Sequence, residues 1–154
     1  MAYQTRVFSL LWRLLAPAGR EGLVEDLAQE TFLRVFRALP GFQAEGARLS
    51  TWILTIATRL GIDELRRTRP GHDDLAVAQQ VASNASPERD AVARSEARRV
   101  QEAMGQLTAD QRAVLVLSVY LELPHDEIAQ VLACEPGTVK SRLSRARQAL
   151  RDAT

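Results

Sequence analysis

Residues 126–147 read DEIAQVLACEPGTVKSRLSRAR, in which two helical patterns flank a turn of about three residues. The first pattern is short and extends from His125 to about Leu132. The second extends from about Pro136 to Arg151, and its apolar residues recur at intervals of four, three and four, which places them on one narrow face of a helix. These residues are Val139, Leu143, Ala146 and Leu150. A short helix, a tight turn and a second helix together predict a helix-turn-helix, whose second helix enters the major groove of DNA.

The second helix also carries concentrated positive charge. The chain has a net charge of +1, from 20 basic and 19 acidic residues, but residues 136–154 hold five basic residues against one acidic, a net +4. Residues 105–135 hold one basic residue against five acidic, a net −4. Arginine and lysine donate to guanine edges, and serine bonds to a base edge or a phosphate. The alternative is an ordinary solvated amphipathic helix. The side chains predicted to face DNA are Thr138, Lys140, Ser141, Arg142, Ser144, Arg145 and Gln148.

The rest of the chain is also predicted to be helical, because it lacks two-residue apolar alternation and runs of β-branched residues. Phe32 and Phe36 are at helical spacing and are predicted to be core. Residues 70–86 are the predicted linker. We therefore expect an all-α protein with two small helical domains, 1–69 and 87–154, joined by that linker. The predicted helices are Tyr3 to about Ala16, about Leu23 to Leu39, Thr51 to about Arg67 with Ser50 as N-cap, Pro87 to about Gln106, and one opened by a capping box at Thr108 and Gln111.

Composition excludes several classes of protein. The 154 residues are 46% apolar and 25% charged, as in a folded globular protein, and no run of 18 apolar residues predicts a membrane span. The single cysteine, Cys134, cannot form an internal disulfide, so a reducing, cytoplasmic setting is expected. It is predicted to pack as a small apolar residue, with a redox switch as the alternative. His72 and His125 lack partners at metal-ligand spacing, and no phosphate loop or nucleophile elbow is present, so neither an enzyme nor a cofactor or metal is expected.

Several motifs together resemble a known family. LTADQRAVLVL (107–117), DEIAQVL (126–132) and GTVKSRLSRAR (137–147) resemble region 4 of the extracytoplasmic-function (ECF) sigma factors, promoter-recognition subunits of bacterial RNA polymerase. EDLAQETFLRVFR (25–37) resembles their region 2.2, and TWILTIA (51–57) with DELRR (63–67) resembles regions 2.3 and 2.4. The resemblance implies a non-enzymatic factor that binds core polymerase and directs initiation by recognising the −10 and −35 elements, the latter through the basic helix.

The resemblance also assigns roles within region 2. A coiled coil of the polymerase β′ subunit would dock on a surface formed by Asp26, Gln29, Glu30, Leu33 and Arg37. The loop from Pro40 to Ser50 would capture a flipped base of the −10 element. A base that has left the stack exposes its Watson–Crick edge, so side chains can recognise it by hydrogen bonding. Trp52 could instead anchor this loop, and the acids near the start of the second helix could simply favour its N-terminus electrostatically. The residues expected at the −10 strand are Phe42, Arg48, Trp52, Arg59, Arg66 and Arg67.

The implied partners are core polymerase, through the β′ coiled coil and the β flap, promoter DNA, and an anti-sigma factor, with no membrane insertion. The free chain is expected to be compact, held by contact between its two domains or by that inhibitor. The alternative function is a LuxR-type helix-turn-helix regulator that does not bind core polymerase. Such a regulator would have no need of the N-terminal domain.

The chain departs from the family pattern at Thr58-Arg59, where Arg-Asn is common, and at Pro124-His125, which lacks a hydroxyl cap. Ala133 replaces a common glycine in the turn, and the segment before region 2.2 is shorter than usual.

Overall fold

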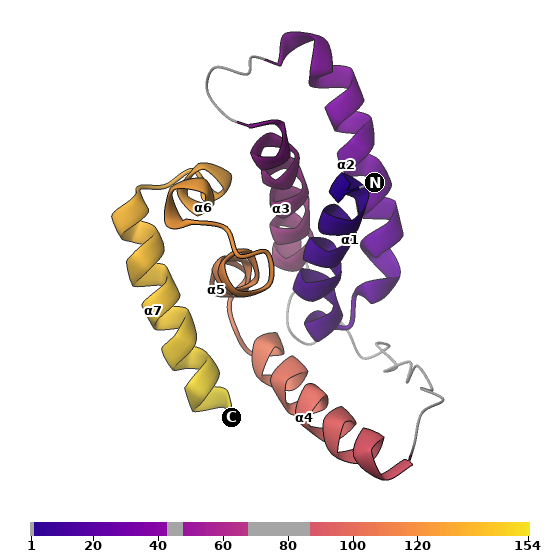
Figure 1. Cartoon of the computed structure of the whole chain (residues 1–154), viewed down its shortest axis with the longest axis vertical. Helices are drawn as coiled ribbons and strands as arrows, with labels where there is room; N and C mark the ends of the chain where they lie inside the picture. The colour runs from indigo at the N-terminus through magenta and orange to yellow at the C-terminus, as the bar shows by residue number, and fades with distance from the viewer. Residues whose placement is uncertain (1, 43–47, 68–86) are drawn as a thin grey trace.

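The computed structural model describes residues 2–42, 48–67 and 87–154, and every regular element in these ranges is a helix (Figure 1). The predicted linker and most of the predicted base-capturing loop lie outside the described residues. The α-helices are α1 (Ala2–Leu15), α2 (Val24–Ala38), α3 (Leu49–Arg67), α4 (Pro87–Gly105), α5 (Ala109–Leu115), α6 (His125–Leu132) and α7 (Pro136–Ala153). Short 3-10 turns are η1 (Ala16–Ala18), η2 (Glu21–Leu23) and η3 (Leu39–Gly41), and η4 (Val116–Tyr120) is a π-helical turn. The predicted all-α class is confirmed.

In the N-terminal half, α1, α2 and α3 all pack against one another, with leucine-rich faces turned inward. Leu10, Leu11 and Leu14 on α1 are fully buried. Gly61 lets α3 approach α1 closely, because a Cβ atom at this position would lie 2.8 Å from Cδ1 of Leu14. The predicted N-cap at Ser50 is wrong, since α3 begins at Leu49, two residues before the predicted start at Thr51.

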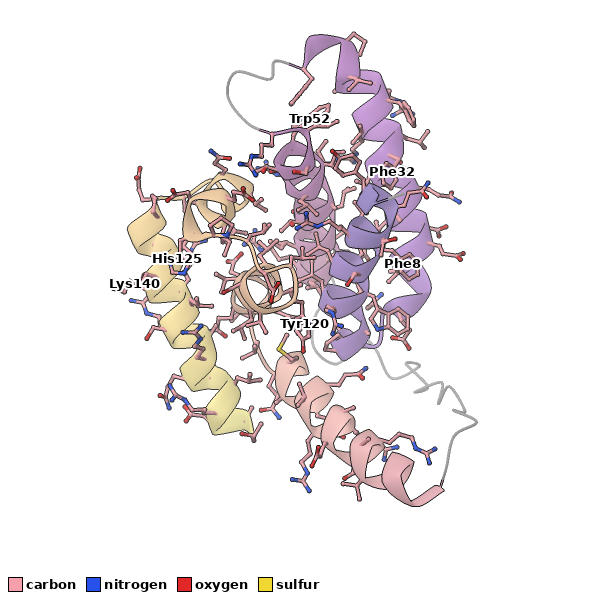
Figure 2. The ribbon with its side chains drawn as sticks, in the orientation of Figure 1. Phe8, Phe32, Trp52, Tyr120, His125 and Lys140 are labelled. Atoms are coloured by element: carbon pink, nitrogen blue, oxygen red, sulfur yellow. The ribbon has the colours of Figure 1, made fainter. Side chains whose placement is uncertain are left out.

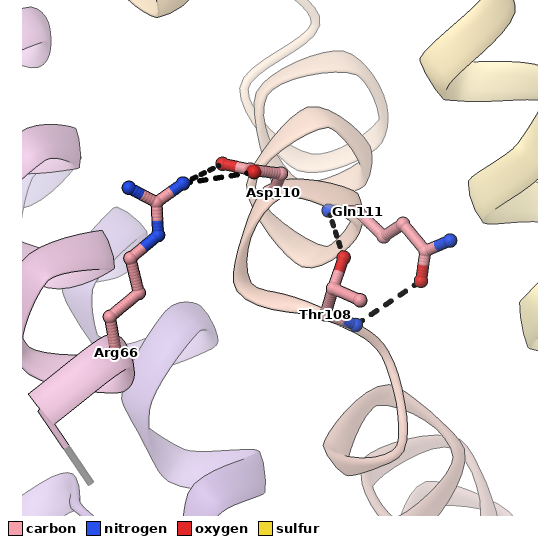
Figure 3. Close-up of polar contacts among 4 residues, drawn as sticks. All are labelled: Arg66, Thr108, Asp110 and Gln111. Carbon is pink, nitrogen blue, oxygen red and sulfur yellow. Dashed lines mark hydrogen bonds and ion pairs between the residues drawn. The ribbon is translucent and has the colours of Figure 1, made fainter. Parts of the chain in front are cut away.

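The C-terminal half begins with the capping box that the sequence predicts. Gln111 N donates to Thr108 Oγ1 and Thr108 N donates to Gln111 Oε1, each at 3.1 Å (Figure 3). The helix that follows is short: α5 ends at Leu115, and the chain widens into η4, where Leu121 N donates to Val116 O at 3.1 Å. Its inward residues nevertheless join the core that also receives the apolar stripe of α7.

The turn between α6 and α7 is a Schellman motif built on alanine. Ala133 has φ 54° and ψ 51°, so it adopts the left-handed conformation that glycine adopts at little cost. Cys134 N donates to Ala129 O at 3.0 Å and Ala133 N donates to Gln130 O at 3.3 Å, which satisfies the last carbonyls of α6. Cys134 is half-buried and packs against the core, in agreement with its predicted packing role.

The two halves pack against each other in this structure. The helix α3 of the N-terminal half lies against α5 and α6 of the C-terminal half (Figure 1), and buried apolar residues of both halves form one contiguous cluster. Their ability to separate stays a prediction, because the segment that joins them is outside the described residues.

One buried cation joins the halves. Arg112 on α5 is only 4% exposed and donates to four main-chain carbonyls: Met104 O at 2.9 Å, Gly105 O at 3.2 Å, Leu107 O at 3.2 Å and Leu14 O at 2.8 Å. These carbonyls lie at or just beyond the C-terminal ends of α4 and α1, where the helix dipole is negative. Burial lowers the pKa of Arg112 to about 10, so the guanidinium is charged at neutral pH.

Candidate nucleic-acid interface

The outward face of α7 is a row of polar and cationic side chains. Val139, Leu143 and Ala146 are buried on the opposite side, which fixes the rotation of the helix about its axis. Figure 2 shows Lys140 directed away from the body of the molecule. In the described part of the chain, none of Lys140, Arg142, Arg145 and Arg147 forms an ion pair. The exposed side chains are Lys140, Ser141, Ser144, Arg145, Arg147, Gln148 and Arg151, while Thr138 and Arg142 are half-exposed at the edges.

Some polar groups of α7 are already engaged within the helix. Thr138 N and Val139 N both donate to Glu135 O, at 2.9 and 3.2 Å, so these two amides are not free to bind a phosphate. Ser141 Oγ donates to Thr138 O. Gln148 Nε2 donates to Asp152 Oδ1, and Arg151 Nη2 donates to Gln148 Oε1. The unpaired cations are therefore the groups on α7 that are most available to DNA.

The ends of the predicted base-capturing loop meet in an aromatic stack. The rings of Phe42 and Trp52 lie 4.7 Å apart at 25°. Trp52 is half-buried and packs against the core. Its contact with a flipped base stays a prediction, as does that of Phe42.

The four predicted −10 arginines are all exposed, but they differ in their surroundings. Arg66 donates to both carboxylate oxygens of Asp110 at 2.9 and 3.0 Å (Figure 3), and Arg48 lies 3.4 Å from Glu127. Both acids belong to the C-terminal half. Arg67 pairs with Glu64 on its own helix at 3.5 Å, and Arg59 forms no ion pair with another described residue.

The Thr58-Arg59 pair points in two directions. Thr58 is only 1% exposed, and its Oγ1 has no hydrogen-bond partner among the described residues. Arg59 points outward at the edge of a hollow of about 270 Å³, which Arg66 on α3 and Leu132 on α6 also line. The departure from the family pattern thus places a permanent cation on the surface and a threonine in the interior.

The exposed face of α2 carries the residues expected to bind core polymerase. Asp26, Gln29, Leu33 and Arg37 are exposed, and Glu30 is half-exposed and pairs with Arg34 at 3.0 Å.

The prediction that Phe36 is core is wrong, since its side chain is 70% exposed, whereas Phe32 does pack against the core. Phe36 lies about 100° around the helix from buried Val35. This angle places Phe36 on the outer face beside Leu33, which is 48% exposed. A helical projection of α2 separates these two side chains from the buried face and could have predicted their exposure.

Two further classes of site are absent from residues 2–42, 48–67 and 87–154. No cluster of three or more histidine, cysteine or acidic side chains in these ranges has an arrangement suited to a metal ion. None of the helices described is both long and apolar enough to span a bilayer.

Family models match both halves of the chain. Residues 1–70 match "Sigma-70 region 2" and residues 97–150 match "Sigma-70, region 4". The region 2 match decides against the LuxR-type alternative, which lacks such a domain.

Individual relatives match nearly the whole chain. The ECF RNA polymerase sigma factor SigW of Bacillus subtilis is 33% identical over 97% of this chain and 83% of its own length. The ECF RNA polymerase sigma factor SigC of Mycobacterium tuberculosis is 36% identical over 91% of this chain and 75% of its own length.

Solved structures agree with these matches. The sigma factor RpoE from Bartonella quintana, solved in complex with the anti-sigma factor NepR, has a TM-score of 0.72 and 25% identity, covering 99% of this chain and 91% of that chain. CnrH, solved in complex with the cytosolic domain of CnrY, has a TM-score of 0.66 and 25% identity, covering 94% of this chain and 79% of that chain. The chain belongs to the ECF sigma factors of bacterial RNA polymerase.

Proposed function

We propose that this sigma factor binds core polymerase through the outer face of α2, grips the −35 duplex with α7, and holds the opened −10 strand with α3 and the loop that precedes it. In this proposal residues 1–69 are the −10 domain, residues 70–86 are the linker and residues 87–154 are the −35 domain. The chain acts in the cytoplasm as a binding factor without catalytic activity of its own.

The observation that carries this proposal is the outer face of α7. Four cations on this helix have no ion pair with a described residue, while the opposite face is locked into the core by Val139, Leu143 and Ala146. A helix fixed in rotation presents the same side chains to a groove every time it docks, and arginine and lysine are the residues that read guanine.

The −10 and −35 sites require two separable bodies. Two DNA elements more than one helical turn apart, about 34 Å, favour two recognition domains that can move relative to each other. We therefore infer that the two halves move apart on core polymerase. An anti-sigma factor is the expected inhibitor, since RpoE, to which this chain is similar, was solved with such a partner.

Transcription in vitro tests the proposal. The purified chain is added to core polymerase from its own bacterium on genomic fragments, and the 5′ ends of the transcripts are mapped. We expect stable core binding and a shared pair of upstream motifs. A chain with Lys140→Ala and Arg145→Ala should bind core polymerase normally and lose the upstream motif. Absence of both core binding and promoter-dependent initiation with the unmodified chain would refute the proposed function.

A further inference from the structure

A hollow of about 270 Å³ lies where α3 meets α5 and α6. Its most buried walls are Thr58, Ile62 and Val131, which are 1%, 8% and 3% exposed. Its rim is charged, because two arginines and two aspartates also line it. The rim residues are Arg59, Asp63, Arg66 and Asp110, and Leu132 completes the lining. The hollow is smaller than the sites that hold drug-sized molecules, so its size suits a small ligand.

The hydroxyl group of Thr58 is a buried polar group without a partner. Two other helical threonines, Thr31 and Thr55, donate to the carbonyl four residues earlier, at 2.8 and 2.7 Å. The buried Oγ1 of Thr58 makes no hydrogen bond to a described residue. A buried polar atom that stays unpaired costs free energy, and a ligand or a water that supplies the hydrogen bond removes this cost. Because Thr58 lines the hollow, its hydroxyl is available to a molecule bound there.

The rim of the hollow offers one unpaired charge of each sign. Arg66 and Asp110 neutralise each other through hydrogen bonds of 2.9 and 3.0 Å (Figure 3). Arg59 and Asp63 are exposed, and neither forms an ion pair with a described residue. They are four positions apart on α3, so their side chains leave the same face of the helix. A carboxylate would satisfy Arg59 and an ammonium group would satisfy Asp63.

The charge balance of the rim selects between classes of ligand. Its two arginines and two aspartates give no net charge, and complementary potentials favour a ligand that is also neutral overall. A zwitterion meets this condition, whereas a simple anion such as phosphate would leave Asp63 facing a like charge.

We propose that this hollow binds a small free α-amino acid whose side chain carries a hydroxyl group, such as threonine. The carboxylate pairs with Arg59 and the ammonium group with Asp63, which is feasible because an α-amino acid carries both groups on one carbon. The side chain extends inward, where its hydroxyl bonds to Thr58 and its carbon atoms contact Ile62 and Val131. The walls come from both halves of the chain, so the bound amino acid stabilises their present arrangement by mass action.

The test titrates the isotope-labelled full-length chain with L-threonine and follows its backbone amide resonances by NMR. We expect saturable shifts that are centred on residues 58–63 and 131–132. L-Valine has the same shape with a methyl group in place of the hydroxyl, so it should bind about three- to tenfold more weakly. Absence of saturable shifts around the hollow with L-threonine overturns the inference.

Thr58→Val tests the contact with the hydroxyl. The variant keeps the shape of the side chain and should fold, because Thr58 Oγ1 makes no hydrogen bond to a described residue. Its preference for L-threonine over L-valine should disappear. Thr55→Val on the same helix is the matched control and should keep the preference, because Thr55 donates to Thr51 O and does not line the hollow. A preference that survives Thr58→Val overturns the inference.

Two analogues of threonine test the charged rim. β-Hydroxybutyrate lacks the ammonium group and isopropanolamine lacks the carboxylate, while both keep the hydroxyl. Each should bind at least about threefold more weakly than L-threonine, because one exposed ion pair is lost. Equal binding by either analogue overturns the assignment to an amino acid. The measurements use neither polymerase nor DNA, so their outcome is independent of the proposed function.

Discussion

Arg112 Nη1 donates to the carbonyl oxygen of Leu14 at 2.8 Å, a hydrogen bond that joins residues 98 positions apart and ties α5 to the last turn of α1. The same guanidinium holds three carbonyls of its own half. In the separated arrangement that we propose, Arg112 would lose the bond to Leu14 and could keep the other three. One side chain thus both supports the C-terminal half and ties it to the N-terminal half in this structure.

Replacing Arg112 with alanine should destabilise the chain by about 2–4 kcal/mol, because four buried carbonyls lose their donor. Urea denaturation followed by circular dichroism measures the change. The loss should be the same at pH 6 and pH 8: burial lowers the pKa of Arg112 only to about 10, so the folded chain keeps the proton throughout this range. Arg99→Ala, at an exposed site on α4, should cost less than about 0.5 kcal/mol. Similar losses for both variants would contradict the role of Arg112.

Ala133→Gly should stabilise the chain by about 0.5–1 kcal/mol, because glycine adopts the left-handed conformation at this position without steric cost. Thermal or urea unfolding tests this. Ala97→Gly, in the exposed middle of α4, is the matched control and should destabilise by about 0.5–1 kcal/mol. A loss of stability at Ala133 equal to that at Ala97 would mean that the turn carries no strain.

Arg145→Ala should weaken binding by about 1–3 kcal/mol at one position of the −35 element and relax specificity there. Lys140→Ala should either do the same at another position or weaken all sequences alike, in which case Lys140 contacts a phosphate. Binding of the holoenzyme to promoters with single-base changes distinguishes the two. A uniform loss for Arg145→Ala would show that it too binds only the DNA backbone.

Phe36→Ala and Leu33→Ala should each weaken core polymerase binding several-fold while changing the free energy of unfolding by less than about 0.5 kcal/mol, because both side chains are exposed. Competition against a labelled sigma factor measures the affinity. Val92→Ala removes an equally exposed apolar side chain from α4 and should leave core binding unchanged. Normal affinity of both α2 variants would exclude this face as the docking surface.

Gly105→Ala should push the two halves apart, since the new Cβ would lie 2.7 Å from the main-chain oxygen of Pro17, which cannot move without shifting η1. Small-angle scattering should show a larger radius of gyration than that of the unmodified chain. Gly22→Ala is the control, because a Cβ there meets nothing within 4 Å. An unchanged radius with unchanged stability would show that the contact at Gly105 adapts without opening the molecule.

Features set by neighbours along the chain were predictable from the sequence. The capping box of Thr108 and Gln111, the apolar stripe of α7 and the left-handed turn at Ala133 all depend on residues within a few positions of one another. Such short-range geometry is dictated by helical periodicity and capping chemistry. Ser50 shows the ordinary error of this reasoning, a helix boundary displaced by two residues.

Features set by packing between distant elements required the tertiary structure. Phe36 was expected inside because aromatic residues at helical spacing usually face a core, but the rotation of α2 against α1 and α3 places it in solvent. From the sequence, Arg112 is indistinguishable from a surface cation on a helix. In the structure it is buried and donates to Leu14 O on α1, in the other half of the chain.

The closed arrangement of the two halves is the clearest case. The positive charge of the N-terminal half and the acidic segment at 105–135 are visible in the sequence, yet Arg66 and Asp110 are 44 positions apart. The sequence shows that opposite charges are present, but only the fold brings Arg66 and Asp110 within hydrogen-bond distance. The sequence by itself therefore determined most of the helices, the capping box of Thr108 and Gln111 and the outward side of α7, because these are local. The tertiary structure decided which of the predicted −10 arginines pair with acids of the C-terminal half, because this depends on how two helical bodies pack.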